Sequence, residues 1–115
     1  MLSRSVTGFM KPLLLTNEYP PNIYGGAGIH VQYLSRELSK LCDVEVRCFG
    51  EQLKEDLNPK VYGAHTDKLN YTAPKDLQSV FSALQNCLEF NTRNIDADVV
   101  HLHTWYSHFG GILAH

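Results

Sequence analysis

The sequence predicts an α/β fold in which a Rossmann-like parallel sheet is flanked by helices. Three short apolar runs, at 12–16, 43–49 and 97–103, have the length and composition of strands. Segments with helical periodicity separate them, and strands that alternate with helices favour a parallel sheet. The last helical segment reaches His115 without a stop signal, so we expect the chain to hold an incomplete first half of such a domain.

The composition disfavours several classes of protein. The 115 residues carry a formal net charge of −2 and their basic residues are scattered, whereas a nucleic-acid footprint needs a basic patch. No apolar run approaches the roughly 20 residues of a membrane helix, and 1–9 lacks the apolar core of a secretory signal. Three cysteines in no close pair match neither a zinc site nor a disulfide framework. We therefore expect a cytoplasmic protein with no nucleic-acid or membrane partner and with a disordered leader over 1–9.

The first half of the chain predicts a strand, a loop, a helix and a second strand. Three consecutive leucines predict a buried strand over 12–16. Two prolines and three glycines make 17–28 a loop. From about Ala27, apolar residues recur on one helical face, at Val31, Leu34, Leu38 and Leu41. In 43–49 apolar residues alternate with charged ones, which predicts a strand with one polar face, near the edge of the sheet.

The second half predicts a helix and a third strand after a poorly patterned stretch. Residues 51–73 mix charges with proline and glycine, and we expect mostly loop there, with a short strand at 60–62. A helix follows from Pro74 to about Asn91, where proline suits the first turn. Its apolar stripe consists of Leu77, Val80, Phe81, Leu84 and Leu88. The third strand, at 97–103, leads through a short turn into the last helical segment.

The order of these elements predicts where a ligand would bind. In a doubly wound sheet the second strand pairs on one side of the first, and a later strand pairs on the other. The strand at 12–16 is then central, with the strand at 98–103 as its neighbour across the topological switch point. Ligands bind beyond the carboxyl ends of strands at such a point. The loop 17–28 and the turn 103–107 should therefore face each other across one cleft.

A glycine-rich turn precedes the first helix and consists of Gly25, Gly26, Ala27 and Gly28. Glycines let a ligand approach the backbone, and the positive end of a helix suits a phosphate. A tight turn without a ligand explains the same glycines equally well. A dinucleotide site needs G-x-G-x-x-G and an acidic residue at the end of the second strand. Both are missing, so we expect no NAD or FAD and no other cofactor.

Histidines end the third strand and point to a sugar site. His101 and His103 share one side of the strand, but no carboxylate or cysteine lies near them at ligand spacing, which disfavours a metal. At the strand tip His103 can hydrogen-bond a substrate, and Trp105 offers an apolar face to a sugar. We expect His101 to be a core histidine. Packing alone is the alternative role for Trp105.

Polar residues of the first loop complete the candidate site. Glu18 can either accept hydrogen bonds from backbone amides and shape the loop, or act in catalysis. Tyr24 and His30 can reach into the cleft. The sequence shows no Ser-His-Asp arrangement, no P-loop lysine and no pair of carboxylates placed for general acid and base catalysis.

Two stretches resemble the signatures of a known enzyme family. LLTNEYPP at 14–21 and YGGAGIHV at 24–31 resemble the N-terminus of glycogen synthases, which are retaining GT-B glycosyltransferases. DVVHLHTW at 98–105 resembles the second signature of the family at the expected separation. The resemblance covers 10–115 and is closest to the branch found in actinobacteria, cyanobacteria and archaea.

The resemblance implies a two-domain enzyme with its active site between two Rossmann domains. Residues 10–115 would form part of the N-terminal, acceptor-side domain, and the other domain would bind the donor, ADP-glucose or UDP-glucose. Glucose would pass with retention to an α-1,4-glucan. Gly25 and Gly26 would lie against the donor phosphates, and His103 would contact the hydroxymethyl group of the transferred sugar. Charge stabilisation of the leaving nucleotide would come from outside this chain, so we expect the chain alone to be inactive.

Two departures leave the substrates open. The best-known bacterial synthases carry a lysine near the glycine pair, where this chain has Tyr24, and many have aspartate where it has Thr104. Some members of the branch join glucose to glucose 1-phosphate, so a sugar phosphate is an alternative acceptor. Another retaining GT-B transferase and, from a different class, a stand-alone Rossmann-like binding module are the other hypotheses.

Overall fold

The computed structural model describes residues 10–64 and 72–114, so the predicted leader at 1–9 lies outside the described residues. The strands are β1 Pro12–Thr16, β2 Glu45–Phe49, β3 Leu53–Lys54, β4 Lys60–Ala64 and β5 Val99–His103. The helices are α2 Gly26–Leu38, α3 Gln78–Phe90 and α4 His108–Ala114, with 3₁₀ turns at Lys75–Leu77 and Trp105–Ser107. The fold is the predicted α/β arrangement.

The five strands of the described residues form one sheet in the order β3-β4-β2-β1-β5. All neighbouring pairs are parallel except β3 and β4, which are antiparallel. The register places Thr16 beside His103 at the carboxyl ends of β1 and β5. The predicted central position of the first strand is therefore confirmed, as is its neighbour across the switch point.

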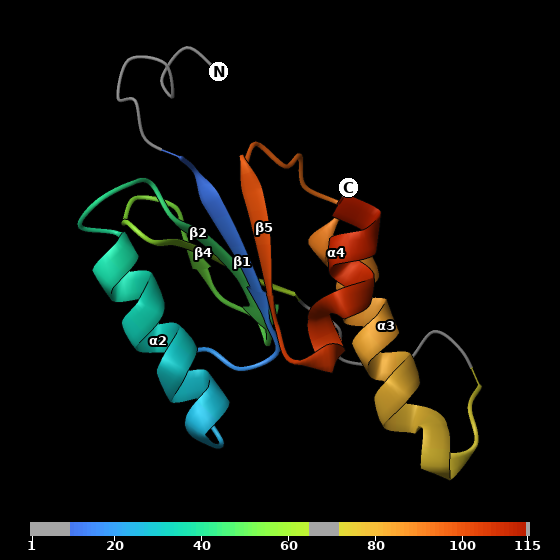
Figure 1. Ribbon diagram of the computed structural model, residues 1–115. Helices are drawn as coiled ribbons and strands as arrows, with labels where there is room; N and C mark the ends of the chain where they lie inside the picture. The colour runs from blue at the N-terminus through green and yellow to red at the C-terminus, as the bar shows by residue number, and fades with distance from the viewer. Residues whose placement is uncertain (1–9, 65–71, 115) are drawn as a thin grey trace.

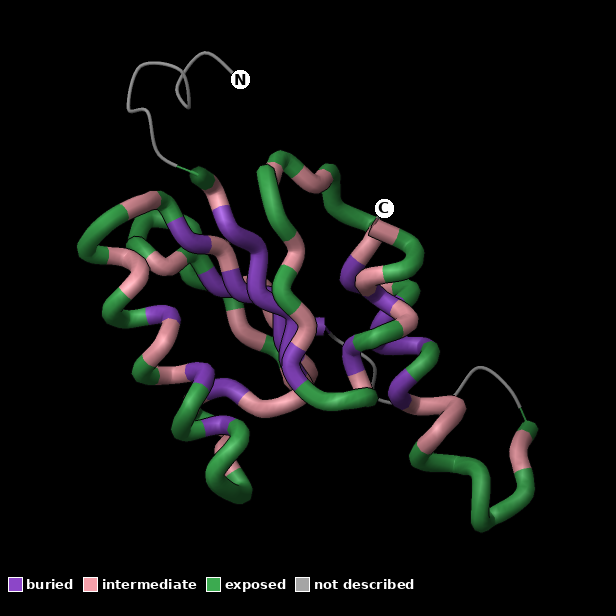
Figure 2. The backbone as a smooth tube through the Cα atoms, in the orientation of Figure 1, coloured by how far each residue is buried: buried purple, intermediate pink, exposed green. Residues whose placement is uncertain are grey.

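Helices cover both faces of this sheet, with α2 on one side and α3 and α4 together on the other (Figure 1). Leu14 of β1 packs in a cluster with Val31 of α2, whereas Leu13 and Leu15 pack in a second cluster with Phe90 of α3. Alternate side chains of a strand point to opposite faces, so a strand covered on both sides needs a continuous apolar run. Burial is concentrated on this central strand, as Figure 2 shows.

The expected edge position of the second strand is wrong, because β2 lies between β1 and β4. Its charged side chain Arg47 is only 2% exposed. The guanidinium donates to Oε2 of Glu45 at 2.6 Å and to the carbonyl oxygens of Phe90, Arg93 at 3.1 Å and Asn94 at 2.7 Å. A buried charge is tolerated when it is paired in this way. The polar alternation of the strand therefore reflects a buried ionic network.

Two further boundaries differ from the predictions. Helix α2 ends at Leu38, and Leu41 is 67% exposed because the chain has already left the helix. The stretch expected to be mostly loop contains β3 and a strand β4 that continues to Ala64, since pairing with β2 extends it. Among the described residues, no helix has the length and apolar character to cross a membrane.

Candidate functional site

The loop after β1 and the turn after β5 are in contact at the carboxyl edge of the sheet, as the topology predicted, and the cleft expected between them stays a prediction. The Thr104 hydroxyl donates to Oδ1 of Asn17 at 3.2 Å. On the α2 side, the ring centroids of His30 and His103 are 5.9 Å apart. Three separate segments, the first loop, the start of α2 and the end of β5, therefore bring side chains to one place.

His103 is buried at this edge of the sheet, with 8% of its surface exposed. Its backbone N–H donates to Oγ of Ser107 at 3.1 Å. Its ring atom Nε2 is buried and has no hydrogen-bond partner among residues 10–64 and 72–114. Buried polar atoms are normally paired, so an orphaned nitrogen at the edge of a switch point suits a ligand hydroxyl.

Burial lowers the pKa of His103 to about 4, and the nearby imidazoles of His101 and His30 act in the same direction. Desolvation and like charge both disfavour the imidazolium form. The ring is therefore neutral at physiological pH, and Nε2 serves as a neutral hydrogen-bonding group. This suits recognition of an uncharged hydroxyl.

His101 corrects an expectation, because it is exposed and does not belong to the core. Its ring lies 4.3 Å from that of His103, so the shared side of the strand is as expected. Its exposure follows from the place of β5 at the outer end of the described sheet order. Within the described ranges, no three His, Cys, Asp or Glu side chains are grouped to hold a metal ion.

Glu18 shapes the glycine turn through backbone contacts. Its Oε1 accepts hydrogen bonds from the N–H groups of Tyr24 at 2.8 Å and Gly25 at 3.0 Å. Gly28 is buried beside it, and a Cβ there would lie 2.8 Å from the same oxygen. Of the two roles considered for Glu18, these contacts favour the structural one.

Gly25, Gly26 and Ala27 remain exposed at the start of α2. A Cβ on either glycine would meet nothing within 4 Å, and neither has a positive φ. Packing and backbone conformation within the described residues therefore do not explain these two glycines. The first N–H groups of a helix lack intrahelical acceptors, and an open backbone there lets an anion approach.

Aromatic side chains flank this edge. Trp105 is 52% exposed and stacks on Tyr106 with ring centroids 4.1 Å apart. Tyr24 is 83% exposed, and His30 is also exposed. Trp105 thus packs against a neighbour and still presents apolar surface to a sugar. Its exposure and its stacking are compatible with both roles considered for it, packing and sugar binding.

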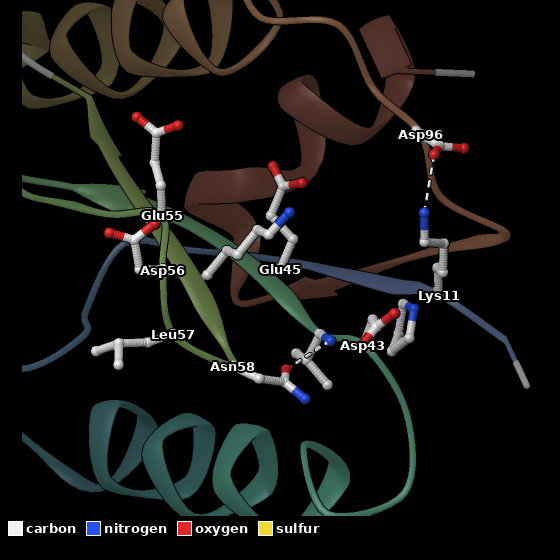
Figure 3. A pocket seen from close by; sticks show the side chains of 11 residues that line it. Lys11, Asp43, Glu45, Glu55, Asp56, Leu57, Asn58 and Asp96 are labelled. Atoms are coloured by element: carbon white, nitrogen blue, oxygen red, sulfur yellow. Dashed lines mark hydrogen bonds and ion pairs between the residues drawn. The ribbon is translucent and has the colours of Figure 1, made fainter. Parts of the chain in front are cut away.

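A separate hollow, which no pattern in the sequence indicates, lies at the opposite, amino-terminal edge of the strands (Figure 3). Its volume is about 370 Å³, and its lining includes Asp43, Glu45, Asp56 and Asp96. Nζ of Lys11 pairs with Oδ2 of Asp96 at 2.9 Å. This acidic lining disfavours a phosphate group, so the carboxyl edge remains the candidate site.

Comparison with known proteins identifies the family. Residues 24–115 match Glycosyltransferase Family 4. The chain belongs to this family. It is 38% identical over 105 residues to an alpha-maltose-1-phosphate synthase of Mycolicibacterium smegmatis, across 91% of this chain and 25% of the relative. It is 37% identical over 105 residues to an alpha-maltose-1-phosphate synthase of Mycobacterium tuberculosis, across the same shares.

The chain thus spans about a quarter of the length of these curated relatives. Family membership and the mostly parallel sheet together identify part of a GT-B Rossmann-like domain. The resemblance to GT-B glycosyltransferases is therefore confirmed at the level of family and fold. The relatives carry the name of the alternative reaction, maltose 1-phosphate formation, and the glycogen synthase assignment gains no support from them.

Proposed function

We propose that this chain is the N-terminal, acceptor-side part of a retaining glucosyltransferase. The donor is ADP-glucose or UDP-glucose, and the acceptor is glucose 1-phosphate, so that the product is maltose 1-phosphate. Two relatives with that name, at 38% and 37% identity, favour this acceptor over an α-1,4-glucan. The observation that carries the proposal is the buried, unpartnered Nε2 of His103, which lies at the switch point of a Family 4 domain.

Six of the predicted site residues have a ligand-binding role in this proposal. His103 hydrogen-bonds the hydroxymethyl group of the transferred glucose through its neutral ring. The open turn at Gly25 and Gly26 admits the donor phosphates to the backbone N–H groups of α2. Trp105 and Tyr24 offer apolar surface to the sugar rings, and His30 lines the same edge.

In this proposal the residues of this chain bind and orient the substrates, and they contribute little to stabilising the charge of the leaving nucleoside diphosphate. The leaving nucleoside diphosphate needs cationic or dipolar partners in the transition state. In GT-B enzymes these come from the second domain, so we expect the chain alone to bind ligands without transferring glucose.

The test is transfer of labelled glucose from each donor to glucose 1-phosphate and to glycogen. The assay uses this chain and a chimera in which it replaces the matching quarter of the Mycolicibacterium smegmatis relative. His103→Ala should lower kcat/KM of the chimera at least about 10-fold, because a ligand hydroxyl loses its buried partner. His108→Ala, which removes an exposed imidazole at the start of α4, should change little. No transfer from either donor by a folded chimera would overturn the proposal.

A further inference from the structure

Thr104, directly after β5, has a backbone conformation that threonine almost never adopts. Its φ is 68° and its ψ is 163°. Glycine alone populates this region readily, because a side chain there collides with the backbone. Within residues 10–64 and 72–114, Thr104 is the one non-glycine residue with a positive φ. Strain of this kind persists only where surrounding contacts impose it.

Two neighbouring side chains impose this conformation. The buried Ser107 hydroxyl accepts from the N–H of His103 at 3.1 Å and lies 3.0 Å and 3.1 Å from the carbonyl oxygens of His103 and Thr104. The N–H of Ser107 also donates to the Thr104 carbonyl at 3.3 Å. On the other side, the Thr104 hydroxyl donates to Asn17 in the loop after β1. The turn is therefore held from both of its ends.

The residue before this turn is His103. Its ring is 4.3 Å from that of His101 and 5.9 Å from that of His30, and its Nε2 is buried without a partner. The pairing of His103 with Thr16 sets the face of the sheet on which this ring lies. The conformation of Thr104 sets the direction in which the chain leaves β5, and with it the place of the Ser107 hydroxyl against the backbone of His103.

We propose that Thr104 is a positioning residue, whose strained backbone, held by Ser107 and Asn17, fixes the His103 imidazole for the sugar hydroxyl. This inference rests on the proposed function, since it takes His103 to be the group that contacts the sugar. Glycine would adopt the same conformation without strain but would also leave it freely. Threonine adds the hydroxyl bond to Asn17, which ties the glycine-bearing loop to the strand end.

The experiment compares Thr104→Gly, which removes the strain and the hydroxyl, with Thr104→Ser, which keeps the hydroxyl and a Cβ. Thr92→Gly is the matched control, because Thr92 is also exposed and its hydroxyl also donates a hydrogen bond, to the carbonyl of Glu89 at 2.8 Å. Melting temperature and the titration of the His103 ring by NMR are measured in the chain itself. The kinetic constants are measured in the chimera described above.

Thr104→Gly should keep or raise the melting temperature, whereas Thr92→Gly should lower it, because only the first relieves strain. The titration midpoint of His103 should move up by about one unit toward its usual value in Thr104→Gly, as the ring leaves its buried position. In the chimera, kcat should fall about 10-fold with a smaller change in KM, and Thr104→Ser should restore most of it.

An unchanged His103 titration and an unchanged kcat in Thr104→Gly would overturn the inference and leave Thr104 as a turn residue. A melting temperature that falls as far as in Thr92→Gly would also count against it, because no strain would then be stored. If neither donor supports transfer while the His103 titration still shifts, the proposed function fails, whereas the effect of Thr104 on the position of the His103 ring stands.

Discussion

Gly28 and Glu18 are in direct contact at the start of α2: a Cβ on Gly28 would lie 2.8 Å from Oε1 of Glu18 and 3.0 Å from its Cβ. Cγ1 of Ile23 would lie 3.1 Å away on the same side. The same Glu18 oxygen accepts the N–H groups of Tyr24 and Gly25. Because Gly28 has no side chain, it leaves room for the Glu18 carboxylate, which shapes the turn.

Gly28→Ala should destabilise the protein by about 1–3 kcal/mol, because the new methyl group overpacks this contact. In an ordinary helix interior the same change stabilises by roughly 0.5–1 kcal/mol, so the sign is diagnostic. Gly26→Ala is the control, since its Cβ would meet nothing within 4 Å. The free energy of unfolding in urea distinguishes the two. Equal effects would show that Glu18 and Ile23 move aside at no cost.

Glu18→Ala should destabilise by about 1 kcal/mol, because the Tyr24 and Gly25 N–H groups lose their acceptor and are partly open to water. Glu18→Gln keeps an acceptor oxygen in the same place and should lose less. Urea unfolding of both variants measures the difference. If the glutamine variant were as unstable as the alanine variant, the negative charge near the helix start, and not the hydrogen bonds, would be the source of stability.

The sequence predicts the central strand, its neighbours and the meeting of the two loops, because each follows from short-range pattern and the connectivity of alternating strands and helices. It does not predict the burial of Arg47, since the carbonyl acceptors at 90–94 lie more than 40 positions further along the chain. Nor does it reveal the strain at Thr104, because no local signal marks a threonine that is forced into a glycine conformation. The exposure of His101 depends on which elements cover β5, and the periodicity of the sequence does not indicate that.

Arg47→Met should destabilise by at least about 3 kcal/mol, because it leaves the Glu45 carboxylate and three carbonyl oxygens without their buried donor. Arg36→Met is the matched control. Arg36 is exposed and lies 5.0 Å from the ring centroid of Tyr33, so its removal should change the free energy of unfolding by less than about 0.5 kcal/mol. Chemical denaturation at neutral pH measures both. Similar losses for the two variants would show that the hydrogen bonds of Arg47 do not stabilise the folded chain.

The stability of the protein should fall as the pH decreases from about 6.5 to about 4, and His103 should cause part of that fall. The pKa of His103 is lowered to about 4 in the folded state, from 6.5 for an ordinary histidine. Between these values the unfolded chain binds a proton that the folded chain does not, so acidification favours unfolding. The stability that neutral His103 contributes is fully present above pH 6.5. It decreases by about 1.4 kcal/mol per pH unit below that value, so the loss is about 3 kcal/mol by pH 4. His103→Asn, which does not titrate, should flatten the dependence of the urea midpoint on pH across this window. An unchanged slope in that variant would show that His103 is not held in its neutral form.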